Sequence, residues 1–137
     1  MAPVIAAQVV GGIGGVWLAH LMFDLAILEI SAHRRTGLGQ WVGEFVATFG
    51  LVSVIESGKR YFPTALAGVV ASYITAAYWF TSSTSFANPA VTLARALSDT
   101  FAGIAPVDAP LFIVAQCAGA AAALAITGWL LNRHTTS

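Results

Sequence analysis

Charged residues are scarce in this chain of 137 residues. Only 9% of the residues are charged and 58% are hydrophobic, whereas a soluble domain carries roughly a quarter charged residues. Six basic and six acidic residues balance, so the chain lacks the basic field that nucleic-acid binding requires. We therefore predict an integral membrane protein that is surrounded by membrane lipid and has no nucleic-acid partner.

Cysteine is nearly absent as well, and basic residues are missing from the first ten positions. With Cys117 as the single cysteine, an intrachain disulfide framework is excluded. The opening residues, MAPVIAAQVV, carry no basic group, so a cleaved signal peptide is not expected. His20, His33 and Cys117 show neither metal-ligand nor nucleophile–base spacing. We expect no metal, cofactor or catalytic residue, and we expect His20 to be a packed or interfacial histidine.

What the chain has instead is long apolar segments. About 20 apolar residues cross a bilayer as a helix, and segments near that length cover residues 3–23, 40–55, 64–80 and 111–131. The charged stretch 24–40 is predicted to be a solvent-exposed loop, and the stretch ESGKR a short polar turn. The predicted fold class is all-α, with these helices in one transmembrane domain over the whole chain.

Basic residues favour one orientation in the membrane by a narrow margin. Lys59, Arg60 and Arg133 lie on the same side as both termini, and Arg34 and Arg35 lie on the other. The positive-inside rule then predicts cytoplasmic termini. The expected location is the inner, or plasma, membrane, crossed several times.

A short pattern occurs in both the first and the last apolar segment. Residues 7–11 (AQVVG) match residues 115–119 (AQCAG). On this pattern alone, close packing of helices through small residues is favoured by roughly two to one. An internal repeat, which is a common build of membrane transport proteins, is the alternative.

A polar interruption, SSTSFANPAVTLARALSDTFAG, separates the last two apolar segments. Asn88 suits a helix N-cap and Pro89 the first helical position, so a helix is predicted over about residues 88–100. A helix of this length, about 18 Å, would cross half a bilayer, and the non-helical backbone before it would have to be buried or line a water-filled cavity. Such a re-entrant helix repels cations and presents donors to a neutral solute. From physics alone, an extramembrane loop with a surface helix explains these residues equally well.

The sequence around this helix resembles a known family. Asn88, Pro89 and Ala90, preceded by SFA and followed by Val91 and Thr92, resemble the NPA box of the aquaporin, or major intrinsic protein, family. Three further stretches agree with that family along the chain: EFVAT resembles the start of its first and fourth helices, the AQVVG stretch its third helix, and the AQCAG stretch its sixth.

The resemblance implies an incomplete channel. The family has six membrane helices and two NPA half-helices arranged as inverted repeats. Aligned to that plan, this chain holds the third to sixth helices and the second half-helix, that is, four transmembrane helices plus one re-entrant half-helix. We expect a fragment of a longer protein rather than a complete half-length one. The family is usually tetrameric, which implies a homo-oligomer.

The resemblance also implies an unusual selectivity filter. In the family's water channels an arginine stands at the position of Val91 and a histidine at the position of Ala76. Small apolar residues replace both here, which widens the constriction and removes donors. Arg95, one turn beyond Val91, is expected either to edge the outer pore or to pair with Asp99 at i+4. We expect Ser85 to line the pore.

The stretch from residue 77 to residue 106 is similar to bacterial aquaglyceroporin-type channels associated with arsenic detoxification. The similarity implies passive conduction of small neutral solutes, namely glycerol-like polyols, water and, as the leading specific solute, arsenous acid. Glu44 would then support residues 85–88 by accepting their hydrogen bonds, whereas a headgroup-level glutamate near Trp41 is the alternative. The rival function is a truncated or non-conducting membrane subunit that needs a missing N-terminal half or a partner to form a pore.

Overall fold

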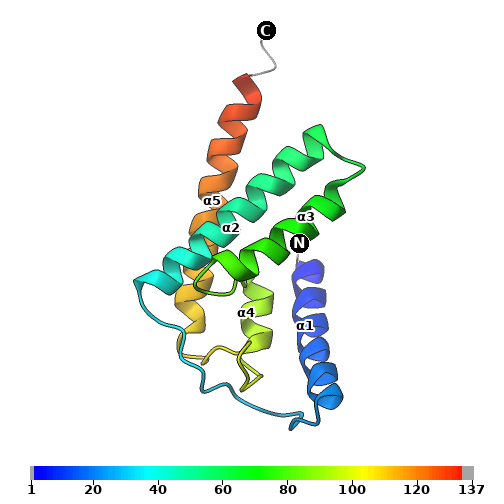
Figure 1. Cartoon of the computed structure of the whole chain (residues 1–137), viewed down its shortest axis with the longest axis vertical. Helices are drawn as coiled ribbons and strands as arrows, with labels where there is room; N and C mark the ends of the chain where they lie inside the picture. Colours follow the sequence, from blue (N-terminus) through cyan, green and yellow to red (C-terminus); the bar gives the residue numbers. More distant parts are fainter. Residues whose placement is uncertain (1, 134–137) are drawn as a thin grey trace.

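The computed structural model describes residues 2–133 and places five helices in them (Figure 1). These are α1 (Ala2–Met22), α2 (Leu38–Tyr61), α3 (Leu66–Phe80), α4 (Pro89–Arg95) and α5 (Ala109–Arg133). No strand occurs within the described residues. The predicted all-α class is confirmed.

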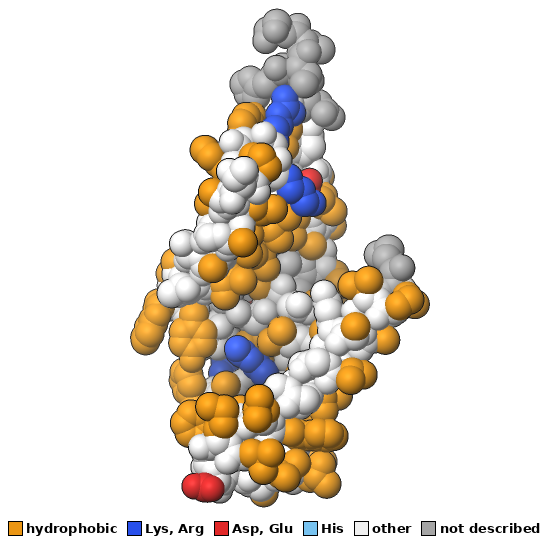
Figure 2. Space-filling view, turned by 90° about the vertical axis from the view of Figure 1, so that its right-hand side faces the viewer, with side chains coloured by type: hydrophobic (Ala, Val, Ile, Leu, Met, Phe, Trp, Pro, Cys, Tyr) orange, Lys and Arg blue, Asp and Glu red, His pale blue; other side chains and the backbone are white. Residues whose placement is uncertain are grey.

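Three of the helices, α1, α2 and α5, are long and apolar enough to cross a membrane. Helix α3 is also apolar but has only 15 residues. Hydrophobic side chains cover most of the face drawn in Figure 2, and charged side chains occur there only at separate places. A surface of this kind is suited to lipid or to another apolar protein surface, not to water.

Two helix ends differ from the sequence prediction. The stretch ESGKR, predicted as a turn, is the last part of α2, where Lys59 forms an ion pair with Glu56 at 2.8 Å. The helix expected over residues 88–100 ends at Arg95. It ends early because Ser98 and Thr100 direct their side-chain oxygens into loop hydrogen bonds, which compete with continued helix.

Helices α2 and α5 pack against each other along much of their length, and α3 lies beside α2. A side chain at Gly119 of α5 would collide with the backbone at Phe45 of α2, so this crossing requires a glycine. The matching Gly11 of α1 meets nothing within 4 Å. The small-residue explanation of the AQxxG pattern therefore holds at Gly119 of α5, while Gly11 of α1 has no packing partner among the described residues.

Helix α4 connects α1 to the rest of the molecule, since it packs against both α1 and α5. The apolar core lies where α4 and the residues before it meet α5. Phe86 and Phe112 make an edge-to-face contact there, with ring centroids 5.3 Å apart, and Trp41 and Val91 pack around this pair.

The prediction of a solvent-exposed loop over residues 24–40 is wrong in part. Ser31 and Arg35 are buried, because this segment runs beneath α4 and binds the loop that follows α4 (Figure 1). Ser31 N donates to the carbonyl of Ala96 at 2.9 Å, and Ala105 N donates to the carbonyl of His33 at 2.7 Å. The segment closes one end of the molecule.

Candidate functional site

The backbone between α3 and α4 reverses direction without helical hydrogen bonding. Thr84, Ser85 and Ala87 have positive φ angles of 62°, 49° and 49°, a region that residues with a Cβ rarely occupy. Such strain persists only where the surrounding structure enforces it. A short irregular segment leading into a half-length helix is the geometry expected of a re-entrant loop.

Glu44 enforces that geometry from α2. Its carboxylate is fully buried and accepts hydrogen bonds from Phe86 N at 2.8 Å and Ala87 N at 2.9 Å. Gln116 of α5 donates to the same carboxylate at 2.6 Å and to Thr92 Oγ1 at 2.9 Å. A buried carboxylate is tolerated when it receives several hydrogen bonds. The headgroup-level alternative for Glu44 is therefore not what the structure contains.

Gln116 was not among the residues singled out for the site. An amide within an otherwise apolar helix is the signal that could have identified it, because polar residues at membrane depth usually face the protein interior. The matching Gln8 of α1 is exposed. Of the two AQxxG stretches, only the second has its glutamine bound to Glu44 and Thr92.

The start of α4 follows the local sequence signals. Asn88 Oδ1 accepts a hydrogen bond from Ala90 N at 2.8 Å, and Pro89 occupies the first turn. Thr92 Oγ1 returns a bond to the carbonyl of Asn88 at 3.0 Å. The NPA box is thus a capped helix start, held in place by the Glu44 network beneath it.

The two expected filter positions do not meet within this chain. Val91 is half-buried and packs against the core, whereas Ala76 is exposed on α3. Helix α3 packs against α2 and makes no close approach to α4. Ser85 is buried, and its hydroxyl has no hydrogen-bond partner in the described part of the chain.

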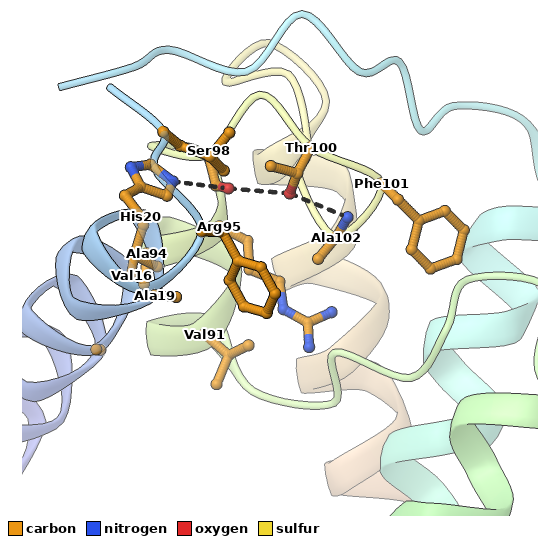
Figure 3. Close-up of a pocket in the computed structure, with 14 residues that line it drawn as sticks. Val16, Ala19, His20, Val91, Ala94, Arg95, Ser98, Thr100, Phe101 and Ala102 are labelled. Atoms are coloured by element: carbon orange, nitrogen blue, oxygen red, sulfur yellow. Dashed lines mark hydrogen bonds between the residues drawn. The ribbon is translucent and has the colours of Figure 1, made fainter. Parts of the chain in front are cut away.

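A cavity of about 940 Å³ lies between α1, α4 and the loop after α4. Its walls are mostly apolar, and Figure 3 shows the side chains that face it. Among them are Val16 and Ala19 from α1 and Val91, Ala94 and Arg95 from α4. One expected filter residue and the expected outer-pore arginine therefore line the same space.

Arg95 does not pair with Asp99. Its guanidinium carbon lies 4.3 Å from the centre of the Phe86 ring, and Asp99 Oδ1 instead accepts from Ala32 N at 2.7 Å. Arg95 Nη1 is buried and has no hydrogen-bond partner among the described residues. Of the two expectations for Arg95, the ion pair is wrong, and a position facing the cavity is what the structure shows.

Arg35 is a residue that sequence reasoning missed. It donates to three backbone carbonyls, those of Gly103 at 2.7 Å, Ser83 at 3.1 Å and Phe101 at 2.7 Å. Its guanidinium also lies 5.0 Å from the centre of the Phe86 ring. Nothing local in the sequence predicts these contacts, because they join segments almost fifty or more positions apart.

His20 anchors the end of α1 to the cavity wall. Its ring nitrogens lie 3.3 Å from the Ile27 carbonyl and 3.0 Å from Ser98 Oγ. Because only a donor can bind the carbonyl, Nδ1 carries the proton in the neutral ring and Nε2 accepts from Ser98. The chain of hydrogen bonds continues through Thr100 to Ala102 N (Figure 3). His20 is therefore a buried, packed histidine.

Asp108 ties the segment before α2 to the start of α5. It accepts from Arg34 Nε at 2.8 Å and Nη2 at 2.9 Å, and from Arg35 N at 2.9 Å. The Arg34 guanidinium holds the pKa of the Asp108 carboxyl below its ordinary value of 3.8. The carboxylate therefore contributes stability that is complete above pH 3.8 and is lost as the pH falls below that value.

We expect Asp108→Asn to lower the thermal stability of the detergent-solubilised chain at neutral pH, where the ionised carboxylate binds Arg34. Below pH 3.8 the difference between the variant and the wild type should shrink, because the wild-type carboxyl is then protonated. Thermal melting followed by circular dichroism, at neutral pH and below pH 3.8, measures the stability difference and its decrease in acid. Asp24→Asn, at an exposed carboxyl, is the control and should follow the wild type. A difference that is the same at neutral and acid pH would contradict the assignment.

Comparison with known proteins gives one informative match. No family model matches the chain, and no solved structure matches it. The aquaglyceroporin AqpS of Rhizobium meliloti (strain 1021) is 55% identical to it over 131 residues, which is 96% of this chain and 56% of the relative. Over almost its whole length, the chain is therefore similar to an aquaglyceroporin. The aquaporin resemblance inferred from the NPA box and its companions is confirmed.

The chain spans about half the length of the curated relative that it matches. Its fold, with a short helix among longer apolar helices, is consistent with part of an aquaporin-like protein.

Proposed function

We propose that the chain forms part of the wall of a passive channel for small uncharged solutes, namely glycerol-like polyols, arsenous acid and water. The observation that carries this proposal is the re-entrant segment. Its strained backbone is held by Glu44, and the half-helix that follows it places Val91 beside a cavity. The similarity to an aquaglyceroporin supports the same function.

The solute class follows from the residues around the path. Val91 and Ala76, at the proposed filter positions, are small and apolar, which leaves room for solutes larger than water. Asn88 and the backbone near Ser85 supply the polar groups of the proposed path. Arsenous acid is neutral at physiological pH, and its hydroxyls resemble those of glycerol. Because the solute only moves along its gradient, no residue performs chemistry.

A second candidate function is a non-conducting membrane subunit that needs a further half or a partner. The observation that favours it is the open side of α1, which packs against α4 alone among the helices and leaves Gln8 exposed. We propose that this side of α1 contacts further channel protein. The assembly would be a homo-oligomer, and a tetramer if it follows the family. It would lie in the inner membrane with both termini in the cytoplasm.

The water-lined path is tested by cysteine labelling. Cys117 is exposed and is first replaced by serine. Val91→Cys and Leu93→Cys are then compared in vesicles with a membrane-impermeant thiol reagent. The two positions share α4, but only Val91 lines the cavity, while Leu93 is 46% exposed outside it. The channel proposal predicts fast labelling at residue 91 that excess glycerol slows, and slow labelling at residue 93.

Equal labelling at both positions, or none at either, would favour the non-conducting subunit. The comparison is matched because both cysteines lie on one short helix and differ only in the side that they face.

A further inference from the structure

Arg95 lies on the same side of α4 as Val91. Four residues advance a helix by about 400°, so the two positions are only about 40° apart around the axis. Side chains on a helix lean toward its N-terminus and cover the turn before their own Cα. A long side chain at position 95 therefore reaches back to the level of Val91, and both residues line the cavity in Figure 3.

Two guanidinium groups lie against one aromatic ring here. Arg35 and Arg95 are 5.0 Å and 4.3 Å from the centre of Phe86. The Arg35 guanidinium already donates hydrogen bonds to three backbone carbonyls. The Arg95 side chain lines the cavity and forms no hydrogen bond or ion pair with the described residues. The ring holds the Arg95 guanidinium in place through a cation–π contact but accepts none of its in-plane N–H bonds.

The charge of Arg95 has no carboxylate partner in the described residues. Glu44, the acid buried beneath the segment, already accepts from Phe86 N, Ala87 N and Gln116, and Asp99 is bound elsewhere. Arg95 is half-buried and lines the cavity, so an acceptor oxygen in the cavity would give the accessible part of its guanidinium a charge-assisted hydrogen bond.

We propose that Arg95 is a specificity-determining residue of the pore, which binds a hydroxyl oxygen of the solute at the level of Val91. The inference rests on the proposed channel function and adds the group that recognises the solute. Arg35 is a positioning residue, since it fixes the carbonyls around Phe86 and leaves Arg95 as the free donor. The ligand class is small and hydroxylated, with an apolar edge that fits the walls formed by Ala94 and Phe101.

The test reads binding without requiring flux. The chain is labelled with ¹⁵N in the arginine guanidinium groups, reconstituted in lipid nanodiscs and titrated with glycerol while the arginine side-chain signals are followed. We expect a saturable shift of the Arg95 signal. Arg60, which binds the Leu131 carbonyl at the other end of the molecule, is the internal control for viscosity and bulk effects and should not move.

Three variants make the test specific. Arg95→Gln is expected to weaken apparent glycerol affinity about tenfold, the order for losing one charge-assisted hydrogen bond. Arg95→Lys should weaken it less, since it keeps the charge but not the planar fork. Val91→Leu leaves Arg95 intact and fills the space that its guanidinium reaches, so it should also weaken binding. An unchanged Arg60 signal and an unchanged circular dichroism spectrum report that each variant is folded.

An Arg95 signal that does not respond to glycerol, or affinity that is unchanged in folded Arg95→Gln, would overturn the assignment. Binding and conduction are separated by design. A shift at Arg95 in a chain that passes no solute would keep the hydroxyl-binding site at Arg95 but would remove the channel function and the pore role of this residue. Solute flux that is unaffected by Arg95→Gln would keep the channel function and overturn the role of Arg95.

Discussion

Replacing Glu44 with glutamine is expected to destabilise the fold by at least about 3 kcal/mol, because one buried amide loses its acceptor and the remaining bonds lose their charge. Phe86 N and Ala87 N both depend on this carboxylate, and so does the Gln116 amide. In the variant, the new amide nitrogen would face one of these donors. The strained backbone at Ser85 and Ala87 would then lose the contact that enforces it.

Thermal unfolding in detergent, followed by circular dichroism, measures this effect. Glu56→Gln is the matched control, because Glu56 is an acid on the same helix whose partner, Lys59, is exposed. An exposed ion pair contributes roughly 0–1 kcal/mol. Equal, small shifts in both variants would show that the Glu44 network does not hold the re-entrant segment.

Replacing Val91 with arginine is expected to reduce glycerol permeation roughly tenfold more than water permeation, a difference of about 1.4 kcal/mol between the two barriers. Val91 is half-buried beside the cavity, and Arg95 already lines the same space. A second long cationic side chain narrows that space and adds donors. Narrowing hinders a three-carbon polyol before it hinders water.

Stopped-flow light scattering on liposomes with outward water and glycerol gradients separates the two rates. Val91→Ile is the control, because it adds a single methylene without charge and should change the ratio little. An equal loss of water and glycerol flux in Val91→Arg would contradict the filter assignment and indicate a general folding defect.

Local chemistry made the start of α4 predictable from sequence. The Asn88 cap and Pro89 at the first turn act within a few residues, and such signals do not depend on the rest of the fold. The end of α4 was not predictable in the same way. Ser98 and Thr100 leave the helix to join His20, and that partner lies about eighty positions earlier in the chain.

Long-range contacts also explain why Arg35 and Gln116 were missed. A pair of arginines in a charged stretch indicates a loop exposed to water, and only the folded chain supplies the three carbonyls that make burial of Arg35 tolerable. Ala76 was assigned to the selectivity filter by aligning the sequence with the family. Alignment to the family fixes which residues correspond but not the distance between them, and the backbones of α3 and α4 do not come close together.

The measurement that tests the channel claim most directly is solute flux into liposomes containing the purified chain, compared with Asn88→Asp. Aspartate keeps the acceptor that binds Ala90 N, so the cap and the fold should survive, while the amide donors are replaced by a negative charge. The account predicts fast permeation of water, glycerol and arsenous acid that falls at least roughly tenfold in Asn88→Asp, about 1.4 kcal/mol in barrier height. Folded wild-type chain that passes none of these solutes, or flux that is indifferent to Asn88, would contradict it and leave the non-conducting subunit as the better account.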